Sequence, residues 1–432
     1  MKKIGIVHHG CAKNLIDTEL MAGKLKDEGF LVTLDAYDKD VDFVIVNTCS
    51  FIFDAEEESV KSIFEMIENG KKVIITGCLA QKHQKHLKKL IPEAYGFLGT
   101  SDIDKIAGLI KNDREFYYVS NNPICKYPES VERAQITVGS SSYIKIAEGC
   151  DYKCGYCIIP KLRGKYISRP IEKIVEEAKH LADKGVNEII LIAQDTSSYG
   201  IDLYKKPSLD KLLYELDKIE NLGWIRVLYT YPTNFTKGLI KAYKEIDRVV
   251  KYVDIPLQHS HPEILKAMKR PIVDGYEFCS KLRDEIKDLA IRTTLITGYP
   301  TENEKHFEHL YNFVEKTRFD RLGVFEFSKE KGTYAYDLKP QVPKRIKKKR
   351  KDLILELQKG ISNEINSKMI GKKIPTIIET IQSDGFIIGR TYKDAPDVDG
   401  LMYINTDEVV NPADIYEVEV TDYNDYDLFG KI

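Results

Sequence analysis

Cys150-Asp-Tyr-Lys-Cys154-Gly-Tyr-Cys157 is an eight-residue loop with three cysteines, and it directly follows the strand-like stretch Tyr143-Ile-Lys-Ile-Ala147. The sequence has no fourth cysteine close to this loop. A 4Fe-4S cube contains four irons and is normally held by four thiolates, so three thiolates leave one iron open to a non-protein ligand. The spacing therefore predicts an iron–sulfur cluster with one open position.

Zinc and disulfide bonds are the alternatives for such a loop. Structural zinc sites usually have four Cys or His ligands in paired spacings, and no nearby histidine or second cysteine pair completes such a set here. The chain has eight cysteines in 432 residues and no signal-peptide pattern, so we expect a cytoplasmic protein with reduced thiols. Both alternatives fit the loop less well than a cluster does.

The composition is that of a globular protein with several domains. Apolar residues make up 43% and charged residues 31% of the chain, which is long enough for two to four domains. A net charge of −2 predicts no overall attraction to nucleic acid. The longest apolar stretches, such as Ile189–Ile192, are too short to cross a bilayer, so we expect no membrane partner and buried parallel strands instead.

The first 115 residues alternate apolar strands with amphipathic helical segments, which predicts a parallel α/β sheet. Ligands bind outside the carboxyl ends of the strands in such sheets. Three expected strands end close to a cysteine, so we expect three thiols to converge there; a free cysteine is more often a small buried hydrophobe, but that explains three coincidences poorly. The strands and their cysteines are 2–7 with Cys11, 43–46 with Cys49, and 73–76 with Cys78.

The middle region repeats a strand followed by a helical segment six times, which predicts a partial (βα)6 barrel. Barrel chemistry takes place at the carboxyl ends of the strands, and polar residues such as Gln194, Gln258 and Gly298 follow the expected strands there. Each of these could equally satisfy a loop backbone. The strands are expected to begin near Tyr143, Glu188, Trp224, Tyr252, Ala290 and Arg321.

The cysteine loop, with an aromatic residue before its last cysteine, resembles that of radical S-adenosylmethionine (radical SAM) enzymes. Further motifs along the chain are His9-Gly-Cys11-Ala-Lys-Asn14, Asn47-Thr-Cys49, Gly77-Cys78-Leu-Ala-Gln81, Glu148-Gly-Cys150 and Ser168-Arg-Pro170. With these motifs the whole chain resembles the methylthiotransferases within the radical SAM superfamily. The resemblance implies four segments: an N-terminal methylthiotransferase domain (1–115), a linker (116–135), a radical SAM core (136–367) and a small all-β, OB-like TRAM barrel (368–432).

The family's chemistry implies two 4Fe-4S clusters and SAM. By resemblance, Cys150, Cys154 and Cys157 hold the cluster that cleaves SAM to a 5'-deoxyadenosyl radical, and the auxiliary cluster that delivers sulfur is held by Cys11, Cys49 and Cys78. Tyr156 would lie against the adenine of SAM, with Gln194, Gln258 and Gly298 as further candidate contacts. Such a radical can remove hydrogen from an unactivated C–H bond, which no side-chain base can deprotonate at neutral pH.

Three other features are left with alternatives. His259 could act as an acid or base, or could make a positioning hydrogen bond. We expect Cys279 to be a core residue in the helix 276–286, and Cys125 to lie in the linker. The basic run Lys344, Arg345, Lys347, Lys348, Lys349, Arg350 and Lys351 could grip phosphate, as in a ribosome contact, or could be a solvated face of a long helix.

The C-terminal segment is acidic, with six basic and thirteen acidic residues in 368–432, a balance of −7. Such a module repels phosphates and attracts basic protein, so a tRNA substrate is not expected. Several motifs also resemble the RimO branch of the family, namely Ala12-Lys-Asn14, Asn47-Thr-Cys49-Ser-Phe51, Gln194-Asp-Thr-Ser-Ser-Tyr-Gly200 and Tyr426-Asp-Leu428. His8-His9 departs from the family's more frequent serine and leucine.

The RimO branch methylthiolates the β-carbon of an aspartate side chain in the S-twelve protein of the small ribosomal subunit, which is strongly basic. The resemblance implies two SAM molecules per product, a sulfur donor, and a low-potential electron donor such as flavodoxin or ferredoxin. The alternative is a tRNA adenosine methylthiotransferase of the MiaB-like branch. Whether free protein or assembled ribosome is the substrate stays open, as does the oligomeric state.

Overall fold

The structure is a computed structural model that describes residues 1–50, 52–125, 127, 133–136, 139–382 and 385–432. Phe51 and part of the predicted linker 116–135 lie outside the described residues. The chain forms two compact units. Unit 1 contains residues 1–138, 147–153 and 157–167, and unit 2 contains residues 139–146, 154–156 and 168–432.

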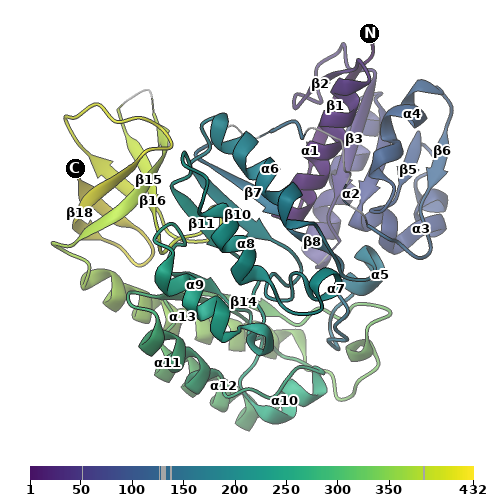
Figure 1. Ribbon diagram of the computed structural model, residues 1–432. Coiled ribbons are helices and arrows are strands. Elements are labelled where there is room, and N and C mark those ends of the chain that lie inside the picture. Colours follow the sequence, from purple (N-terminus) through teal and green to yellow (C-terminus); the bar gives the residue numbers. More distant parts are fainter. Residues whose placement is uncertain (51, 126, 128–132, 137–138, 383–384) are drawn as a thin grey trace. The chain divides into compact units, whose positions relative to one another are not determined.

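Unit 1 is built on a six-stranded parallel sheet in the order β2-β1-β3-β4-β5-β6 (Figure 1). Every residue of β3 is buried, which requires that both faces of the sheet are covered. The parallel α/β prediction is confirmed. The strands are β1 (Lys3–His8), β2 (Leu31–Thr33), β3 (Phe43–Thr48), β4 (Lys72–Gly77), β5 (Gly96–Leu98) and β6 (Phe116–Tyr118).

Helices connect these strands, and an apolar core lies between helices and sheet. Val46 and Ile75 of the sheet pack with Ile63 and Met66 of α2 and with Leu79 of α3. The helices are α1 (Ala12–Asp27), α2 (Phe53–Glu68), α3 (Cys78–Leu90), α4 (Ile106–Lys111) and α5 (Ile159–Arg163), with a 3-10 turn at Ile103–Lys105 and a short strand β8 (Ala147–Glu148).

Unit 2 contains the six predicted βα strands, and the partial barrel is confirmed. They form two three-stranded parallel sheets, β11-β10-β7 and β12-β13-β14, and Val250 N–H, two residues before β12, donates to Ile225 O of β11 (3.1 Å). The strands are β7 (Ser141–Lys145), β10 (Glu188–Ile192), β11 (Trp224–Val227), β12 (Tyr252–Asp254), β13 (Ala290–Thr297) and β14 (Arg321–Glu326), and β9 (Ile167–Ser168) is a short strand at the unit boundary.

Helices follow the barrel strands as expected. Cys279 is fully buried in α11, which confirms its core position. The helices are α6 (Ile171–Asp183), α7 (Ile201–Tyr204), α8 (Leu209–Leu216), α9 (Lys237–Glu245), α10 (Pro262–Ala267), α11 (Gly275–Glu285), α12 (Glu304–Thr317) and α13 (Lys344–Ser367), with 3-10 turns at Pro232–Asn234 and Tyr334–Tyr336.

The last part of unit 2 is a closed five-stranded barrel in the order β15-β16-β17-β19-β18. Ile378, Met402 and Val418 are buried inside it. This confirms the predicted small all-β barrel. The strands are β15 (Lys373–Ile381), β16 (Ile387–Thr391), β17 (Met402–Asn405), β18 (Ile415–Tyr423) and β19 (Leu428–Lys431).

Buried ion pairs join this small barrel to the βα barrel. Asp394 accepts a hydrogen bond from Arg321 Nε (2.6 Å), and Asp399 pairs with Arg292 Nε (3.3 Å). Both carboxylates are nearly inaccessible to water. Arginines therefore neutralise these two carboxylates inside the protein. The accessible surface of the small barrel is less acidic than the count of charged residues in its sequence suggests.

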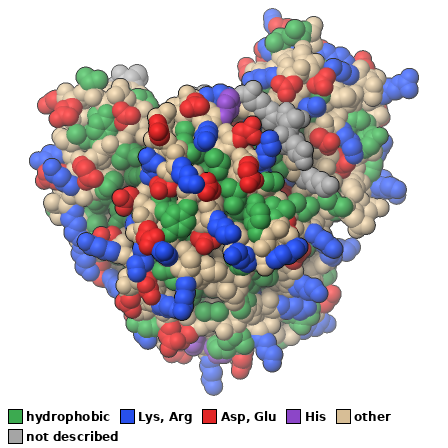
Figure 2. All heavy atoms as spheres, in the orientation of Figure 1, with side chains coloured by type: hydrophobic (Ala, Val, Ile, Leu, Met, Phe, Trp, Pro, Cys, Tyr) green, Lys and Arg blue, Asp and Glu red, His purple; other side chains and the backbone are tan. Residues whose placement is uncertain are grey.

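On the face drawn in Figure 2, blue and red side chains are interspersed over unit 2. No helix among the described residues has the length and apolar character needed to cross a bilayer.

Candidate functional site

The three N-terminal cysteines lie at one edge of the unit 1 sheet. Strands β1, β3 and β4 are neighbours, and Cys11, Cys49 and Cys78 come after their carboxyl ends. Cys49 and Cys78 are buried, whereas Cys11 is exposed at the start of α1. All three cysteines therefore follow neighbouring strands at the same edge of the sheet.

Asn14 ties the three cysteine loops together. Its side-chain amide Nδ2 donates to His9 O (3.1 Å) in the first loop and to Thr48 O (2.9 Å) in the second. Its Oδ1 accepts from Cys78 Sγ (3.8 Å) in the third. One buried side chain thus holds all three strand ends in place.

Two glycines allow the loops to approach this closely. Gly10 has a φ of +96°, and a Cβ there would lie 2.8 Å from Cys49 Cβ. Gly77 has a φ of +88°, and a Cβ there would lie 2.4 Å from Asn47 Oδ1. Any larger residue would be strained at these positions and would push the cysteine loops apart.

Arg163, at the end of α5, reaches the same cluster of side chains. It is 2% exposed, and its Nη2 donates to Asn14 Oδ1 (2.5 Å) and Cys78 Sγ (3.6 Å). Its Nη1 pairs with Asp17 and with Glu148 Oε2 (3.4 Å). The guanidinium therefore supplies positive charge beside a thiol that has buried carboxylates nearby.

The segment that follows Cys157 packs against Cys78. Ile158 and Leu162 form an apolar cluster with Cys78, and Thr100 Oγ1 donates to Leu162 O (2.6 Å). Cys150 N–H donates to Gly164 O (3.1 Å). Unit 1 therefore contains all three N-terminal cysteines and two of the three cysteines of the 150–157 loop.

The thiols of unit 1 differ in their tendency to ionise. Burial raises the pKa of Cys78, although Arg163 opposes this. Desolvation of the thiol would also raise the pKa of Cys11. The positive charges of Lys13 and Arg163 and hydrogen bonds from nearby backbone N–H groups outweigh desolvation, so the pKa of Cys11 is lowered. Burial raises the pKa of Cys125 to about 12, and its thiol lies 3.7 Å from Thr100 Oγ1. Cys125 therefore stays protonated, as a structural cysteine does.

Unit 2 holds the other part of the loop through its backbone. Gly155 N–H donates to Met268 O (2.7 Å), and Ala335 N–H donates to Gly155 O (2.7 Å). A Cβ at Gly155 would lie 2.7 Å from Tyr299 Oη, so this position also needs glycine. Tyr156 packs on the cluster of buried side chains that contains Met268 and Tyr299.

Arg270 is a site residue that the sequence did not indicate. Its Nη1 lies 3.9 Å from Cys154 Sγ and 3.3 Å from Tyr156 Oη, and its Nη2 donates to Pro256 O (2.7 Å). The guanidinium also stacks 4.5 Å from the centre of the Tyr231 ring. It lies 116 residues along the chain from Cys154, and no local pattern in the sequence marks the contact.

The candidate SAM contacts all follow barrel strands at their carboxyl ends. Gln194 comes after β10, Gln258 after β12 and Gly298 after β13. Gln258 has a φ of +71°, and its backbone pairs with Thr294 and Ile296 of β13. The Gly298 N–H is held by the Glu302 carboxylate at 2.9 and 3.0 Å.

His259 is buried beside this turn. Its Nδ1 accepts the His261 N–H (2.9 Å), and its Nε2 lies 3.5 Å from Glu302 Oε2. Burial lowers the pKa of His259, although Glu302 acts in the opposite direction. Its two ring nitrogens thus face a backbone N–H and a buried carboxylate.

His261, Glu263 and His306 come close enough to one another to suggest a metal site. The hydrogen bonds argue against that role. His306 Nδ1 accepts the Asn303 N–H (3.2 Å) as part of a helix cap, so its proton is on Nε2, which faces Glu263 Oε2 at 3.0 Å. A metal ion at Nε2 would have to displace this proton or move it to Nδ1, which would break the hydrogen bond of the helix cap.

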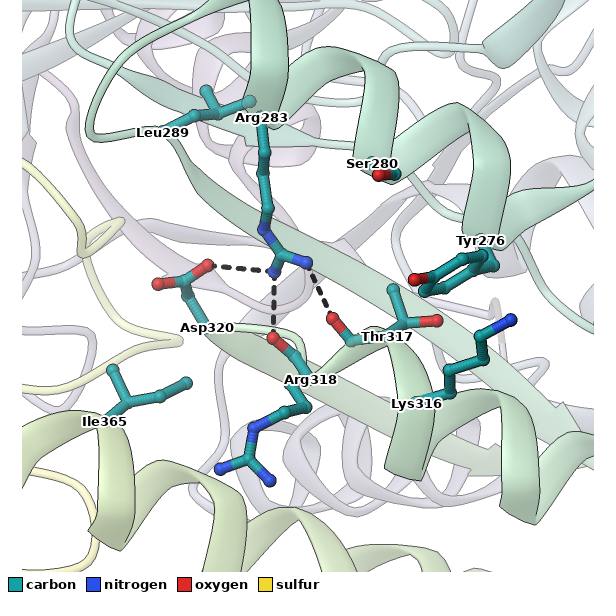
Figure 3. Close-up of a pocket in the computed structure, with 9 residues that line it drawn as sticks. All are labelled: Tyr276, Ser280, Arg283, Leu289, Lys316, Thr317, Arg318, Asp320 and Ile365. Atoms are coloured by element: carbon teal, nitrogen blue, oxygen red, sulfur yellow. Dashed lines mark hydrogen bonds and ion pairs between the residues drawn. The ribbon is translucent and has the colours of Figure 1, made fainter.

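A separate pocket of about 350 Å³ lies at the opposite ends of β13 and β14 (Figure 3). Its Leu289 and Asp320 directly precede these two strands. Figure 3 shows Arg283 pointing to Thr317 O (2.6 Å), Arg318 O (2.8 Å) and Asp320 (3.5 Å). Because barrel cofactors bind at carboxyl strand ends, this pocket is not the expected SAM site.

Three family models match the chain along most of its length. Residues 3–99 match the uncharacterized protein family UPF0004, residues 144–314 match the radical SAM superfamily, and residues 370–432 match the TRAM domain.

The relatives include ribosomal protein uS12 methylthiotransferases RimO from two bacteria. The protein of Rippkaea orientalis is 44% identical over 99% of this chain and 96% of its own length. That of Caldanaerobacter subterraneus is 46% identical over the full length of both.

Two solved structures share the fold at low sequence identity. The radical S-adenosylmethionine methyltransferase TsrM from Kitasatospora setae has a TM-score of 0.55 at 15% identity, covering 75% of this chain and 73% of TsrM. The cobalamin-dependent S-adenosylmethionine radical enzyme OxsB has a TM-score of 0.51 at 10% identity, covering 82% of this chain and 56% of OxsB. These likenesses concern the fold alone.

Proposed function

The chain belongs to the family of ribosomal protein uS12 methylthiotransferases, and we propose that it attaches a methylthio group to the β-carbon of an aspartate side chain of uS12. The named relatives match over full length, which favours this protein-modifying branch over the tRNA-modifying alternative. The enzyme is a radical SAM methylthiotransferase, and we infer that it works in the cytoplasm, where its substrate is.

The observation that carries this proposal is the convergence of Cys11, Cys49 and Cys78 at neighbouring strand ends. Three sulfur donors from one sheet edge, tied together by Asn14, fit an iron–sulfur cluster with an open iron. Free buried cysteines in a core have no need of such a shared support. We assign the auxiliary cluster to these three residues.

We assign the second cluster to Cys150, Cys154 and Cys157, and SAM to the same barrel mouth. The donor set suits the group, because thiolates are the usual ligands of 4Fe-4S clusters. Clusters and SAM together supply the electron and the radical chemistry that a C–H bond requires. Gln194, Gln258 and Gly298 are the proposed SAM contacts, with Tyr156 against the adenine.

Within this arrangement the chain's own residues have defined tasks. Arg270 orients Tyr156 and faces Cys154, and Glu302 holds the turn at Gly298. Asn14 and Arg163 support the auxiliary cysteines. We further propose that a flavodoxin or ferredoxin supplies the electron and that a separate sulfur donor reloads the auxiliary cluster.

Cysteine substitutions test the two assignments separately. Cys154→Ala should abolish 5'-deoxyadenosine formation by the anaerobically reconstituted enzyme, and persistence of that product would refute the radical cluster assignment. Cys49→Ala should keep 5'-deoxyadenosine formation but end methylthiolation of uS12, read by intact mass. Cys279→Ala, a buried cysteine outside both sets, is the matched control and should retain both activities.

The substrate is tested in cells that lack the gene. Intact-mass analysis should show uS12 without its methylthio group, while the tRNA nucleosides stay unchanged. Loss of a methylthio-adenosine with an unchanged uS12 mass would move the chain to the tRNA-modifying branch.

A further inference from the structure

The first two turns of α13 carry cations on two distinct faces. Lys347 is half-buried and Arg350 is 5% exposed, and both turn toward the barrel. The other face is formed by Lys344, Arg345, Lys348 and Lys349, which are all exposed. These four residues form what we call the α13 basic face, and their i, i+4 spacing keeps them on one side of the helix.

The inward cations fix this face at the mouth of the barrel. Lys347 Nζ donates to Phe327 O (2.7 Å), just after β14, and Arg350 Nη1 donates to Glu302 Oε1 (2.8 Å), in the turn after β13. A Cβ at Gly298 would lie 2.3 Å from Lys347 Cγ. The start of α13 therefore packs on the carboxyl strand ends, where barrel chemistry takes place.

The outward cations form no ion pair in the part of the chain that the structure describes. By contrast, two other exposed lysines on helices of this unit do: Lys173 of α6 pairs with Glu176 (2.9 Å) and Lys244 of α9 with Glu285 (3.3 Å). The α13 basic face differs from these two helix surfaces, where a lysine is paired with an acidic residue.

Their position on the helix is also electrostatically unfavourable. The amino end of a helix carries a partial positive charge, so cations there repel it while acidic residues would be favoured. The first turn of α13 contains no acidic residue, and Pro343 provides no side-chain cap. A 24-residue helix that begins in this way concentrates positive potential that the fold leaves uncompensated.

We propose that the α13 basic face docks on the phosphate backbone of RNA in the small ribosomal subunit. The inference rests on the proposed function, because uS12 is the substrate that places the barrel mouth beside ribosomal RNA. uS12 itself is basic and would be repelled by this face, so RNA phosphate is the complementary anion on that particle. The assembled subunit, rather than free uS12, is then the preferred substrate.

The test measures binding of the reconstituted holoenzyme to intact small subunits at several KCl concentrations. The basic-face variant replaces Lys344, Arg345, Lys348 and Lys349 together with glutamine. The slope of log Kd against log salt should fall by about 3, since each lost phosphate contact removes roughly 0.7–0.9 of slope. The matched control replaces four exposed lysines of α2 and α3 with glutamine, namely Lys61, Lys85, Lys88 and Lys89. It should keep the slope of the unmodified protein.

Two further measurements separate the possible partners. The same difference in slope should appear with isolated small-subunit rRNA, and kcat/KM for free uS12 should not fall in the variant. An unchanged slope on intact subunits, or an equal change in the control, overturns the proposal. A difference on subunits that is absent on isolated rRNA overturns it in favour of an acidic protein partner. Binding is measured without turnover, so the result can be interpreted even if the enzyme does not methylthiolate uS12.

Discussion

Arg163→Gln should destabilise unit 1 strongly, because the substitution removes the positive charge from a buried group. The Arg163 side chain is 3% exposed and lies between Asp17 and Glu148, each 7% exposed. Breaking a buried ion pair by removing one partner costs about 3–5 kcal/mol. We expect the upper part of this range, since two carboxylates lose their counter-charge and Asn14 Oδ1 loses a donor at 2.5 Å.

Urea unfolding followed by two probes measures this effect. The chain has a single tryptophan, Trp224, which is buried in unit 2. Far-UV circular dichroism reports both units. We expect the early part of the dichroism transition to move to lower urea, while the Trp224 fluorescence transition stays in place. Lys173→Gln, which breaks an exposed ion pair, is the control and should change stability by less than about 1 kcal/mol.

A double variant shows which partner matters. Asp17→Asn in the Arg163→Gln background removes one of the uncompensated charges, so the combined loss should be smaller than the sum of the two single losses by about 1–3 kcal/mol. Strict additivity of the two substitutions, or a loss below about 1 kcal/mol for Arg163→Gln alone, would refute the reasoning.

Three further predictions concern the sites and their pH dependence. Gly10→Ala should lower the iron content of the auxiliary cluster at nearly unchanged circular dichroism, because its Cβ meets Cys49 at 2.8 Å; full iron and sulfide content by chemical analysis would contradict this. Arg270→Gln should slow reductive SAM cleavage about tenfold or more, since hydrogen bonds to charged groups contribute about 1.5–3 kcal/mol, and it should alter the electron paramagnetic resonance signal of the reduced cluster. Burial, aided by His9, lowers the pKa of His8 to about 4, so the unfolded state binds the extra proton and stability falls as the pH drops from about 6.5 to 4. His8→Gln should make the unfolding midpoint nearly independent of pH over that window. An unchanged pH dependence of the midpoint would show that other groups cause it.

Much of the fold follows from short-range patterns in the sequence. Alternating strands and helices predict parallel sheets because a right-handed crossover needs a helix between neighbouring strands. The carboxyl ends of such strands share one edge, so Cys11, Cys49 and Cys78 could be expected to meet without any coordinates. The six strands of the βα barrel were predicted on the same local basis, whereas the small β-barrel was implied by the resemblance to the TRAM domain, and the long helix α13 was one of two interpretations of the basic run.

Only the tertiary structure revealed the long side chains that support these sites. Arg163 contacts Cys78 across 85 residues, and Arg270 contacts Cys154 across 116. An arginine has several rotatable bonds, and its direction depends on which cavity and which carboxylates surround it after folding. The predicted domain boundaries could not show that the segment after Cys157 belongs to the same compact unit as Cys78.

The basic run at the start of α13 shows the same division. Composition and spacing are local properties, so the seven cations in eight positions and the two trios of cysteines could be recognised without coordinates. The tertiary structure decided that Arg350 is buried against Glu302 while Lys344, Arg345, Lys348 and Lys349 face outward. The physical reason is that the rotation of a helix about its axis is set by the surface on which it packs, and that surface comes from strands far away in the chain.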